Sequence, residues 1–482
     1  MHNIPVIIPI IVYLLLMLVI AAYTSRLGRK KGGGFLEEYF IGSRSLGAFV
    51  LAMTIIATFV SASSFIGGPG VAYSTGLAWV LLSMIQVPTA FLTLGVLGKK
   101  FAIIARRIKA VTVTDYLYAR YQSKAVVFVA SLAILAFFTA MMVAQFIGGG
   151  VLFQNMTGYS YLTGLILFGL IVIIYTTVGG FRAVVFTDAI QAVVMVVATV
   201  TITCAIIKAG GGVESIVDRI AAANPSMLDA NAVPKPQILS FWVLVGIGLL
   251  GLPQTTVRAM SFKDTKALHN SIIIGTVVVG FLMLGMHLAG FFSAGVLAGT
   301  PETSDSVIPM IVMQVLPSFW AGIFLAGPLA AIMSTVSSLL ILASAAIIKD
   351  MLLRFGKKQY DNRQLKKISI LCTAVIGVIT FLCAVKPPDL IVWINLFAMG
   401  GLEAAFFWPT VLGLFWRRAN ASGAICSAIG GVATFLILGG LGFSFHGMNN
   451  IIFGLAVGLV FFIIGTYLGP KPSDRVNEMF FE

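Results

Sequence analysis

The stretch ATFVSASSFIGGPG, residues 57–70, lies within an apolar segment that extends over about residues 45–72. The stretch is rich in hydroxyl-bearing residues and ends in Gly67-Gly68-Pro69-Gly70, which predicts an interruption of the helix there. A second apolar segment, at about residues 238–258, is interrupted in a similar way by Gly251-Leu252-Pro253. Interruptions at matching places in two hydrophobic segments indicate a transport site that is built from broken helices.

The composition indicates that almost the whole chain lies in lipid. Of its 482 residues, 59% are hydrophobic and only 10% are charged, and the mean hydropathy is +1.03. A membrane-spanning helix needs about 20 apolar residues, and it must satisfy its backbone polar groups within itself. The sequence therefore predicts an all-α polytopic membrane protein with about thirteen spans, at roughly residues 5–24, 45–72, 77–98, 125–153, 161–179, 184–208, 238–258, 269–298, 317–347, 367–385, 390–415, 421–442 and 450–469.

The basic residues indicate how the chain crosses the membrane. With the N-terminus placed outside, only four of the 31 lysines and arginines fall in outside loops, namely Lys208, Arg219, Lys235 and Lys386. The positive-inside rule therefore predicts an outside N-terminus and an inside C-terminus. The net charge of +14 is then an orientation signal for the inner membrane rather than a surface for nucleic acid.

The two interruptions also suggest how the chain is organised. Proline and glycine are common in membrane helices, so one interruption alone is a weak signal. Here each would open a block of five spans, and blocks with an odd number of spans insert with opposite orientations, as an inverted repeat does. The predicted parts are residues 1–44, a first transmembrane helix and cytoplasmic loop; 45–208, the first inverted repeat; 209–237, an extracytoplasmic loop with a short helix near 213–223; 238–416, the second inverted repeat; and 417–482, two C-terminal transmembrane helices and a short cytoplasmic tail.

Hydroxyl groups in the ninth predicted span form a candidate cation site. Ala331, Ser334 and Thr335 share one helix face because they are three and four residues apart. Two hydroxyls together with carbonyls freed by a helix break would offer hard oxygen ligands without a carboxylate, which suits a weakly bound monovalent cation. The alternative is that these side chains only hold helices together, as serine and threonine often do in membranes.

Few ionisable residues lie deep in the predicted spans. A charge in the membrane is costly, so Asp188 and Glu403 should face the bundle interior. Asp188 is either a cation relay on the cytoplasmic exit path or a structural partner of Arg182. Glu403 is expected to act as a gate or to hydrogen-bond across the bundle. His287 is expected to be a hydrogen-bonded interior residue, and Arg258 an anchor at the lipid interface rather than an attractor for an anionic solute.

Neutral polar side chains near the interruptions are the candidate solute ligands. Amides and hydroxyls can hydrogen-bond a polar or anionic organic molecule, but they do not identify it. No catalytic arrangement is recognised, so a transporter rather than an enzyme is expected. The candidates are Ser61, Ser63, Ser64, Gln86, Gln145, Gln254, Thr255 and Thr256.

Four stretches resemble motifs of the sodium:solute symporter family. Residues 57–70 resemble its broken helix, and YTTVGGFRAVVFTDAIQ, residues 175–191, resembles its most recognisable signature. AAIMST, residues 330–335, is similar to its sodium-site helix, and WRRANASGA, residues 416–424, to its late cytoplasmic motif. The resemblance extends over essentially the whole chain.

The resemblance implies a LeuT-like fold with two inverted five-helix repeats, and sodium-coupled uptake by alternating access. It also implies that Asp188 lies on the sodium release route. Further stretches, such as residues 61–73, 97–103 and 285–290, resemble the branch of the family that imports pantothenate. A sodium-coupled importer of a monocarboxylate, sugar or amino acid is the alternative, followed by a non-transporting membrane sensor of the same fold. The implied sodium ligands are the carbonyls of Ala57, Val60 and Ala331 and the hydroxyls of Ser334 and Thr335.

Overall fold

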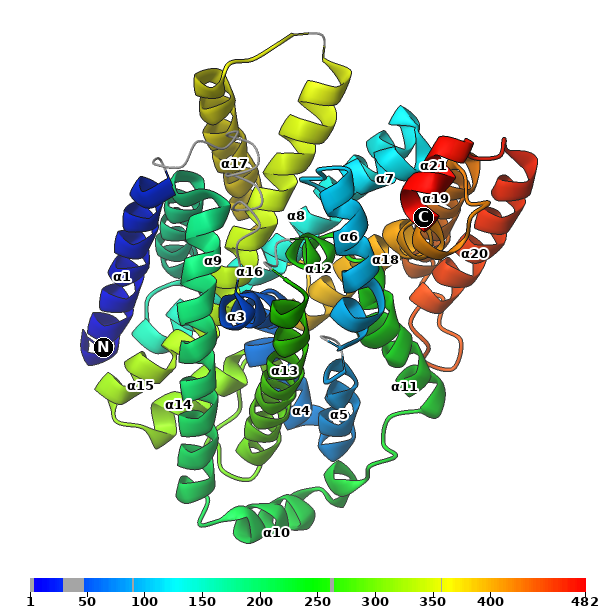
Figure 1. The fold of residues 1–482 in the computed structure, drawn as a ribbon. Helices are drawn as coiled ribbons and strands as arrows, with labels where there is room; N and C mark the ends of the chain where they lie inside the picture. Colours follow the sequence, from blue (N-terminus) through cyan, green and yellow to red (C-terminus); the bar gives the residue numbers. More distant parts are fainter. Residues whose placement is uncertain (1–3, 29–46, 89–90, 261–263, 357) are drawn as a thin grey trace.

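The computed structural model describes residues 4–28, 47–88, 91–260, 264–356 and 358–482, and all regular elements in these ranges are helices (Figure 1). Eleven helical stretches are long and apolar enough to cross a membrane, and a bent pair of helices raises this number to twelve within the described ranges. The seventh predicted span appears as a series of shorter helical pieces over residues 235–259. The fold class is confirmed, whereas the exact number of spans and their orientation remain predictions.

Most predicted spans are long helices. α9 contains two of them, because Gly180 at φ 64° and ψ −174° separates the stretches Tyr161–Phe181 and Ala183–Ala209. Two further spans, Leu77–Arg107 and Ser318–Leu353, are assembled from several helical pieces. The long helices are α1 (Ile4–Gly28), α8 (Lys124–Thr157), α9 (Tyr161–Ala209), α13 (Thr265–Ser293), α16 (Ala326–Ala345), α17 (Asn362–Ala384), α18 (Ile391–Phe415), α19 (Ala421–Gly440) and α20 (Ile451–Leu468).

Shorter helices connect or extend the spans. The predicted helix near 213–223 is confirmed as α10 (Val213–Ala223), at one extreme of the molecule in Figure 1. The others are α5 (Leu77–Ser83), η3 (Met84–Gln86), η4 (Phe91–Gly98), α6 (Lys99–Arg107), α7 (Val113–Tyr121), η5 (Pro225–Leu228), η8 (Ser304–Ser306), α14 (Val307–Val315), α15 (Ser318–Phe324), η9 (Ala346–Leu353) and α21 (Asp474–Phe481).

The first helix break lies earlier than the sequence predicts. α3 (Ala48–Phe59) ends at Val60, which is extended at φ −84° and ψ 125°, and the chain bends by 68° before it continues as η2 (Ser63–Gly67) and α4 (Gly68–Thr75). Residues 67–70 are therefore helical, and the prediction of a break there was wrong. Their glycines permit close packing instead: a Cβ atom on Gly70 would lie 2.0 Å from the carbonyl oxygen of Ser304.

The second break is confirmed at its predicted place. α11 (Lys235–Trp242) continues as a π-turn, η6 (Val243–Ile247), and a 3₁₀ turn, η7 (Gly248–Gly251). Leu252 is extended at φ −67° and ψ 128°, and α12 (Pro253–Ala259) follows. Proline suits the first position of a helix because its missing N–H has no helical partner there.

The centre of the bundle is built around α16. Of the most apolar part of its span, Ser318–Leu353, 89% is buried, compared with 33% for the span Asn362–Ala384. The longest central span thus carries Ser334 and Thr335 in the protein interior, where a polar group needs a partner.

Candidate functional site

The end of α3 and the middle of α16 bring the five predicted ion ligands together. The Ser334 hydroxyl donates to the carbonyl oxygen of Ala57 at 2.9 Å and lies 3.0 Å from that of Ala331. The Thr335 hydroxyl is 3.2 Å from the carbonyl oxygen of Val60 and 3.0 Å from that of Ala331. All five residues are buried. We call these five residues the oxygen cluster.

The break explains why these carbonyls are available. In a continuous helix the carbonyl of Val60 would accept the amide of residue 64. Here the Ser64 amide donates to Ser61 at 3.0 Å, so the Val60 carbonyl points to α16. Three carbonyl and two hydroxyl oxygens form a set of hard ligands that fits an alkali-metal cation. Sodium binding at the oxygen cluster itself remains a prediction.

Gln145 on α8 caps the other side of the first break. Its Oε1 accepts the Ala62 amide at 2.8 Å, and its Nε2 donates to the carbonyl of Met141 at 3.4 Å. Gln145 is fully buried and does not line the solute cavity described below. The predicted solute ligand is therefore engaged by backbone, which sequence could not reveal because the two segments are 83 positions apart.

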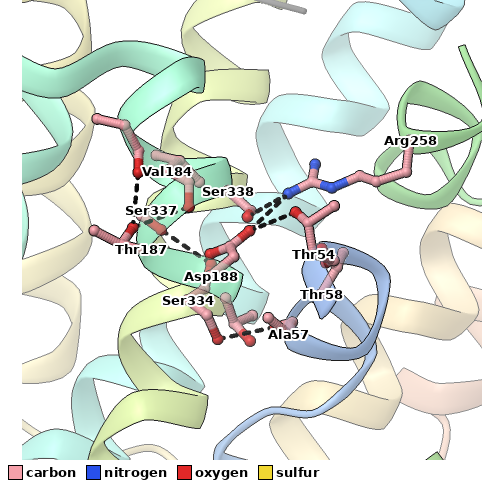
Figure 2. Close-up of polar contacts among 12 residues, drawn as sticks. Thr54, Ala57, Thr58, Val184, Thr187, Asp188, Arg258, Ser334, Ser337 and Ser338 are labelled. Atoms are coloured by element: carbon pink, nitrogen blue, oxygen red, sulfur yellow. Dashed lines mark hydrogen bonds and ion pairs between the residues drawn. The ribbon is translucent and has the colours of Figure 1, made fainter. Parts of the chain in front are cut away.

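Asp188 of α9 is linked through Arg258 to Ser338, which lies one helical turn beyond Ser334 on α16 (Figure 2). Its Oδ2 accepts from the Thr54 hydroxyl at 2.7 Å and lies 3.5 Å from Nη2 of Arg258. The same Arg258 nitrogen donates to the Ser338 hydroxyl at 2.6 Å. The suggested partner Arg182 has a side chain outside the described part of the chain.

Arg258 was predicted to sit at the lipid interface, and this prediction was wrong. Its side chain is 1% exposed, and its guanidinium carbon lies 5.4 Å from the ring centroid of Phe181. The position at the end of an apolar segment suggested an anchor. The short helix α12 instead turns the side chain inward, where Asp188 compensates its charge.

A cavity of about 60 Å³ is lined by residues of the first break and of the helices around it. Four of the predicted solute ligands line it, and so do polar groups that the sequence analysis did not select. Buried Ser63 Oγ and Asn395 Oδ1 have no hydrogen-bond partner within the described residues. His287 is hydrogen-bonded as predicted, with Nδ1 2.7 Å from the carbonyl of Met283. The polar lining residues are Ser61, Ser63, Ser64, Ser83, Gln86, His287 and Asn395, and the main rings are Phe59, Trp79 and Phe241.

Sequence reasoning missed Asn395 for a clear reason. It is one amide within a long apolar span, and nothing in its neighbourhood marks it. The one signal in the sequence is that an amide in an apolar span needs hydrogen-bond partners, and this signal does not depend on a nearby helix break.

The second break contributes less to this cavity than expected. Gln254 and Thr255 line a separate small pocket with Arg258, and Phe59 lines both spaces. The Thr256 hydroxyl donates to the carbonyl of Pro253 at 2.9 Å. The second broken segment lines the solute cavity only with residues that precede its break, namely Phe241, Val245 and Leu249.

Glu403 is fully buried on α18, and its two carboxyl oxygens have no hydrogen-bond partner within the described residues. The expected hydrogen bond across the bundle is therefore not seen. The carboxyl packs against the 3₁₀ turn before the second break, because a Cβ atom on Gly248 would lie 2.2 Å from Oε2. Its predicted gating role is not tested by this geometry.

Known proteins are similar to this chain over nearly its full length. The model of the sodium:solute symporter family matches residues 39–431. The sodium/pantothenate symporter of Escherichia coli (strain K12) is 48% identical, over 97% of this chain and 97% of that protein. The sodium/pantothenate symporter of Haemophilus influenzae is 45% identical, over 98% of this chain and 99% of that protein.

Solved structures share the fold at lower identity. A Na⁺-coupled sialic acid symporter in a substrate-bound outward-open state has a TM-score of 0.80 at 22% identity, covering 97% of this chain and 98% of that one. MhsT in complex with L-phenylalanine has a TM-score of 0.53 at 15% identity, covering 87% and 97%. These structures support the LeuT-like fold. The match of the family model and the relatives at 45–48% identity lead to one conclusion: the chain belongs to the sodium:solute symporter family.

Proposed function

We propose that the chain imports pantothenate together with sodium by alternating access, as a multi-pass protein of the inner membrane. The observation that carries this proposal is the oxygen cluster, which joins the broken end of α3 to α16 directly beside the solute cavity. The proposed identity of the solute comes from the relatives at 45–48% identity, which are sodium/pantothenate symporters.

The position of the oxygen cluster explains how the two ligands would be coupled. A sodium ion held by the carbonyls of Ala57 and Val60 would fix the chain just before Ser61, Ser63 and Ser64. Those serines line the solute cavity. Ordering one site therefore lowers the cost of binding at the other, and such coupling is reciprocal.

The cavity lining is suited to a solute rich in amide and hydroxyl groups. Pantothenate carries one amide, two hydroxyls and a carboxylate, and the lining offers amides, hydroxyls and an imidazole. The solute cavity has a volume of about 60 Å³, which is below the roughly 300 Å³ of the smallest typical ligand pockets. Helices must therefore move to admit the solute.

Asp188 is proposed to lie on the sodium release route. Ser338 is one turn further along α16 than Ser334, toward the end predicted to face the cytoplasm. Sodium leaving the oxygen cluster in that direction would pass Asp188 and compete with Arg258 for its carboxylate.

The available free energy limits how strongly one sodium ion could drive the accumulation of pantothenate. A tenfold sodium gradient supplies about 1.4 kcal/mol and a potential of 100 mV about 2.3 kcal/mol per charge. Symport of one sodium with the pantothenate anion moves no net charge, so only the gradient term remains. The oxygen cluster contains no carboxylate, and we propose a single coupling sodium there.

Uptake of radiolabelled pantothenate into proteoliposomes tests the proposal. We expect uptake that needs an inward sodium gradient, is abolished when potassium replaces sodium, and is competed by excess unlabelled pantothenate. Sodium-independent uptake would contradict symport. Competition by a monocarboxylate, sugar or amino acid in place of pantothenate would favour the alternative importer, and sodium-dependent binding without uptake would favour a sensor.

A further inference from the structure

A second, larger cavity lies next to the solute cavity, on the side predicted to face outward. Its volume is about 310 Å³, within the range of ligand pockets. It is an open depression bordered by α11, the first turns of α18, the end of α19 and the segment of residues 441–450 that joins α19 to α20. We call it the outer cavity. In Figure 1 the segment 441–450 lies beside α11, toward the end of the molecule that carries α10.

Only one layer of side chains separates the two cavities. Phe241 and Leu396 line both of them. The Trp79 ring faces the solute cavity and the Trp393 ring the outer cavity. The Trp79 centroid lies 5.7 Å from that of Phe241 and 6.0 Å from that of Trp393, both edge to face. We call Trp79, Phe241 and Trp393 the aromatic partition.

The partition is attached to an irregular helical segment. Phe241 precedes the π-turn η6 and the 3₁₀ turn η7, and a 3₁₀ stretch inside a helix often marks a hinge. The adjacent Ser240 hydroxyl accepts the Asn449 amide at 2.9 Å, which ties the segment 441–450 to α11. A displacement of α11 would therefore move the partition and the wall of the outer cavity together.

The outer cavity has a lining that matches the solute cavity in kind. It combines aromatic rings with the neutral amides of Gln237, Asn449 and Asn450, and its rim residue Ser444 is exposed. The Oδ1 atom of Asn450 is buried and has no hydrogen-bond partner within the described residues. A buried acceptor without a partner is costly unless a ligand or water supplies a donor.

We propose that the outer cavity is a sodium-independent binding site that holds the transported solute before it passes the aromatic partition. The ligand class is a small organic acid with amide and hydroxyl groups, whose donors pair with Asn450 and Gln237. The inference rests on the proposed import of pantothenate. Sodium is not required here because the oxygen cluster lies beyond the solute cavity, at the break of α3.

Thiol labelling tests this site directly. The native cysteines Cys204, Cys372, Cys383 and Cys426 are replaced by serine, and Asn450→Cys is introduced. A charged, membrane-impermeant methanethiosulfonate then modifies the introduced thiol. We expect pantothenate to slow this modification at least threefold in sodium-free buffer. Asn231→Cys, in the exposed loop before α11, is the matched control, and its rate should not change.

Transport by the same proteins separates the two proposals. If the serine-substituted background and its Asn450→Cys variant both take up pantothenate, but pantothenate does not slow thiol modification of the Asn450→Cys variant without sodium, the outer site is refuted and the symport proposal stands. If the unaltered protein takes up no pantothenate, both are refuted. Should Asn450→Cys be inactive, Gln237→Cys takes its place with the same expected protection.

Kinetics provide an independent measurement. Asn450→Ala and Gln237→Ala should each raise the KM for pantothenate about fivefold, because about 1 kcal/mol is lost with one hydrogen bond, while the maximal rate stays within about twofold. Asn231→Ala should leave both quantities unchanged. A lowered maximal rate with an unchanged KM would contradict an outer binding site.

Discussion

The two helix breaks satisfy their freed backbone groups in different ways. At the first break, the partners come from other helices: Ser334 and Thr335 of α16 reach its carbonyls, and Gln145 of α8 accepts an amide. At the second break, the partners come from the same segment, because the hydroxyls of Thr255 and Thr256 donate to the carbonyl of Leu252 at 2.8 and 3.2 Å.

The difference indicates which break can take part in coupling sodium binding to solute binding. A cation inserted between α3 and α16 would change the contacts of two spans at once, whereas the second break is self-contained. Asp188 connects both regions, since it accepts from Thr54 before the first break and pairs with Arg258 after the second. The following substitutions test this division of roles.

The largest effect is expected at the link between the two breaks. Asp188→Asn leaves the buried Arg258 charge without its partner, and removing one partner of a buried ion pair costs about 3–5 kcal/mol. Thermal unfolding of the purified protein should show a lower Tm. Asp188→Asn with Arg258→Gln should recover at least half of the loss, and a double variant that is less stable than either single variant would contradict the pairing.

The next effect concerns the first break. Ser334→Ala with Thr335→Ala removes two of the five oxygens of the oxygen cluster and should reduce sodium-driven pantothenate uptake about 100-fold, since two ligand contacts at about 1.5 kcal/mol each give that factor. Thr373→Ala with Thr380→Ala is the matched control, because these hydroxyls donate only to their own helix, α17. Unaltered sodium dependence in the first variant would exclude the oxygen cluster as the ion site.

A smaller effect is expected from the cap of the first break. Gln145→Leu leaves the buried Ala62 amide without an acceptor, which costs about 1–3 kcal/mol. Uptake should fall about tenfold, and the half-saturating sodium concentration should rise because the break loses its geometry. Gln145→Glu keeps an acceptor at the same place and should retain more activity than the leucine variant. Equal activity of the two variants would show that the cap has no role.

The smallest effect is expected at the second break. Thr255→Val with Thr256→Val removes both hydroxyls, but the Leu252 carbonyl still accepts the backbone amides of residues 255 and 256. The loss should stay below about 1 kcal/mol, with uptake within about fivefold and an unchanged sodium requirement. A large rise in the half-saturating sodium concentration would show that the second break also serves the ion.

Much of the fold follows from local sequence. Runs of about 20 apolar residues specify spanning helices regardless of their neighbours, because lipid leaves the backbone no other partner. The second break is equally local, since Pro253 lacks the N–H that a continuing helix needs. The spacing of residues 331, 334 and 335 on one helix face likewise identified the α16 part of the oxygen cluster.

Contacts between distant segments decided the rest. Gly67-Gly68-Pro69-Gly70 stays helical because its glycines pack against other helices, and the chain breaks at Val60 instead, where α16 and Gln145 supply partners. Arg258 turns inward because Asp188 lies opposite, and Asn395 enters the cavity because α18 faces the first break. A lone polar residue in an apolar run carries no mark of its partner. Only the packing of helices that are far apart in the chain shows which buried groups meet.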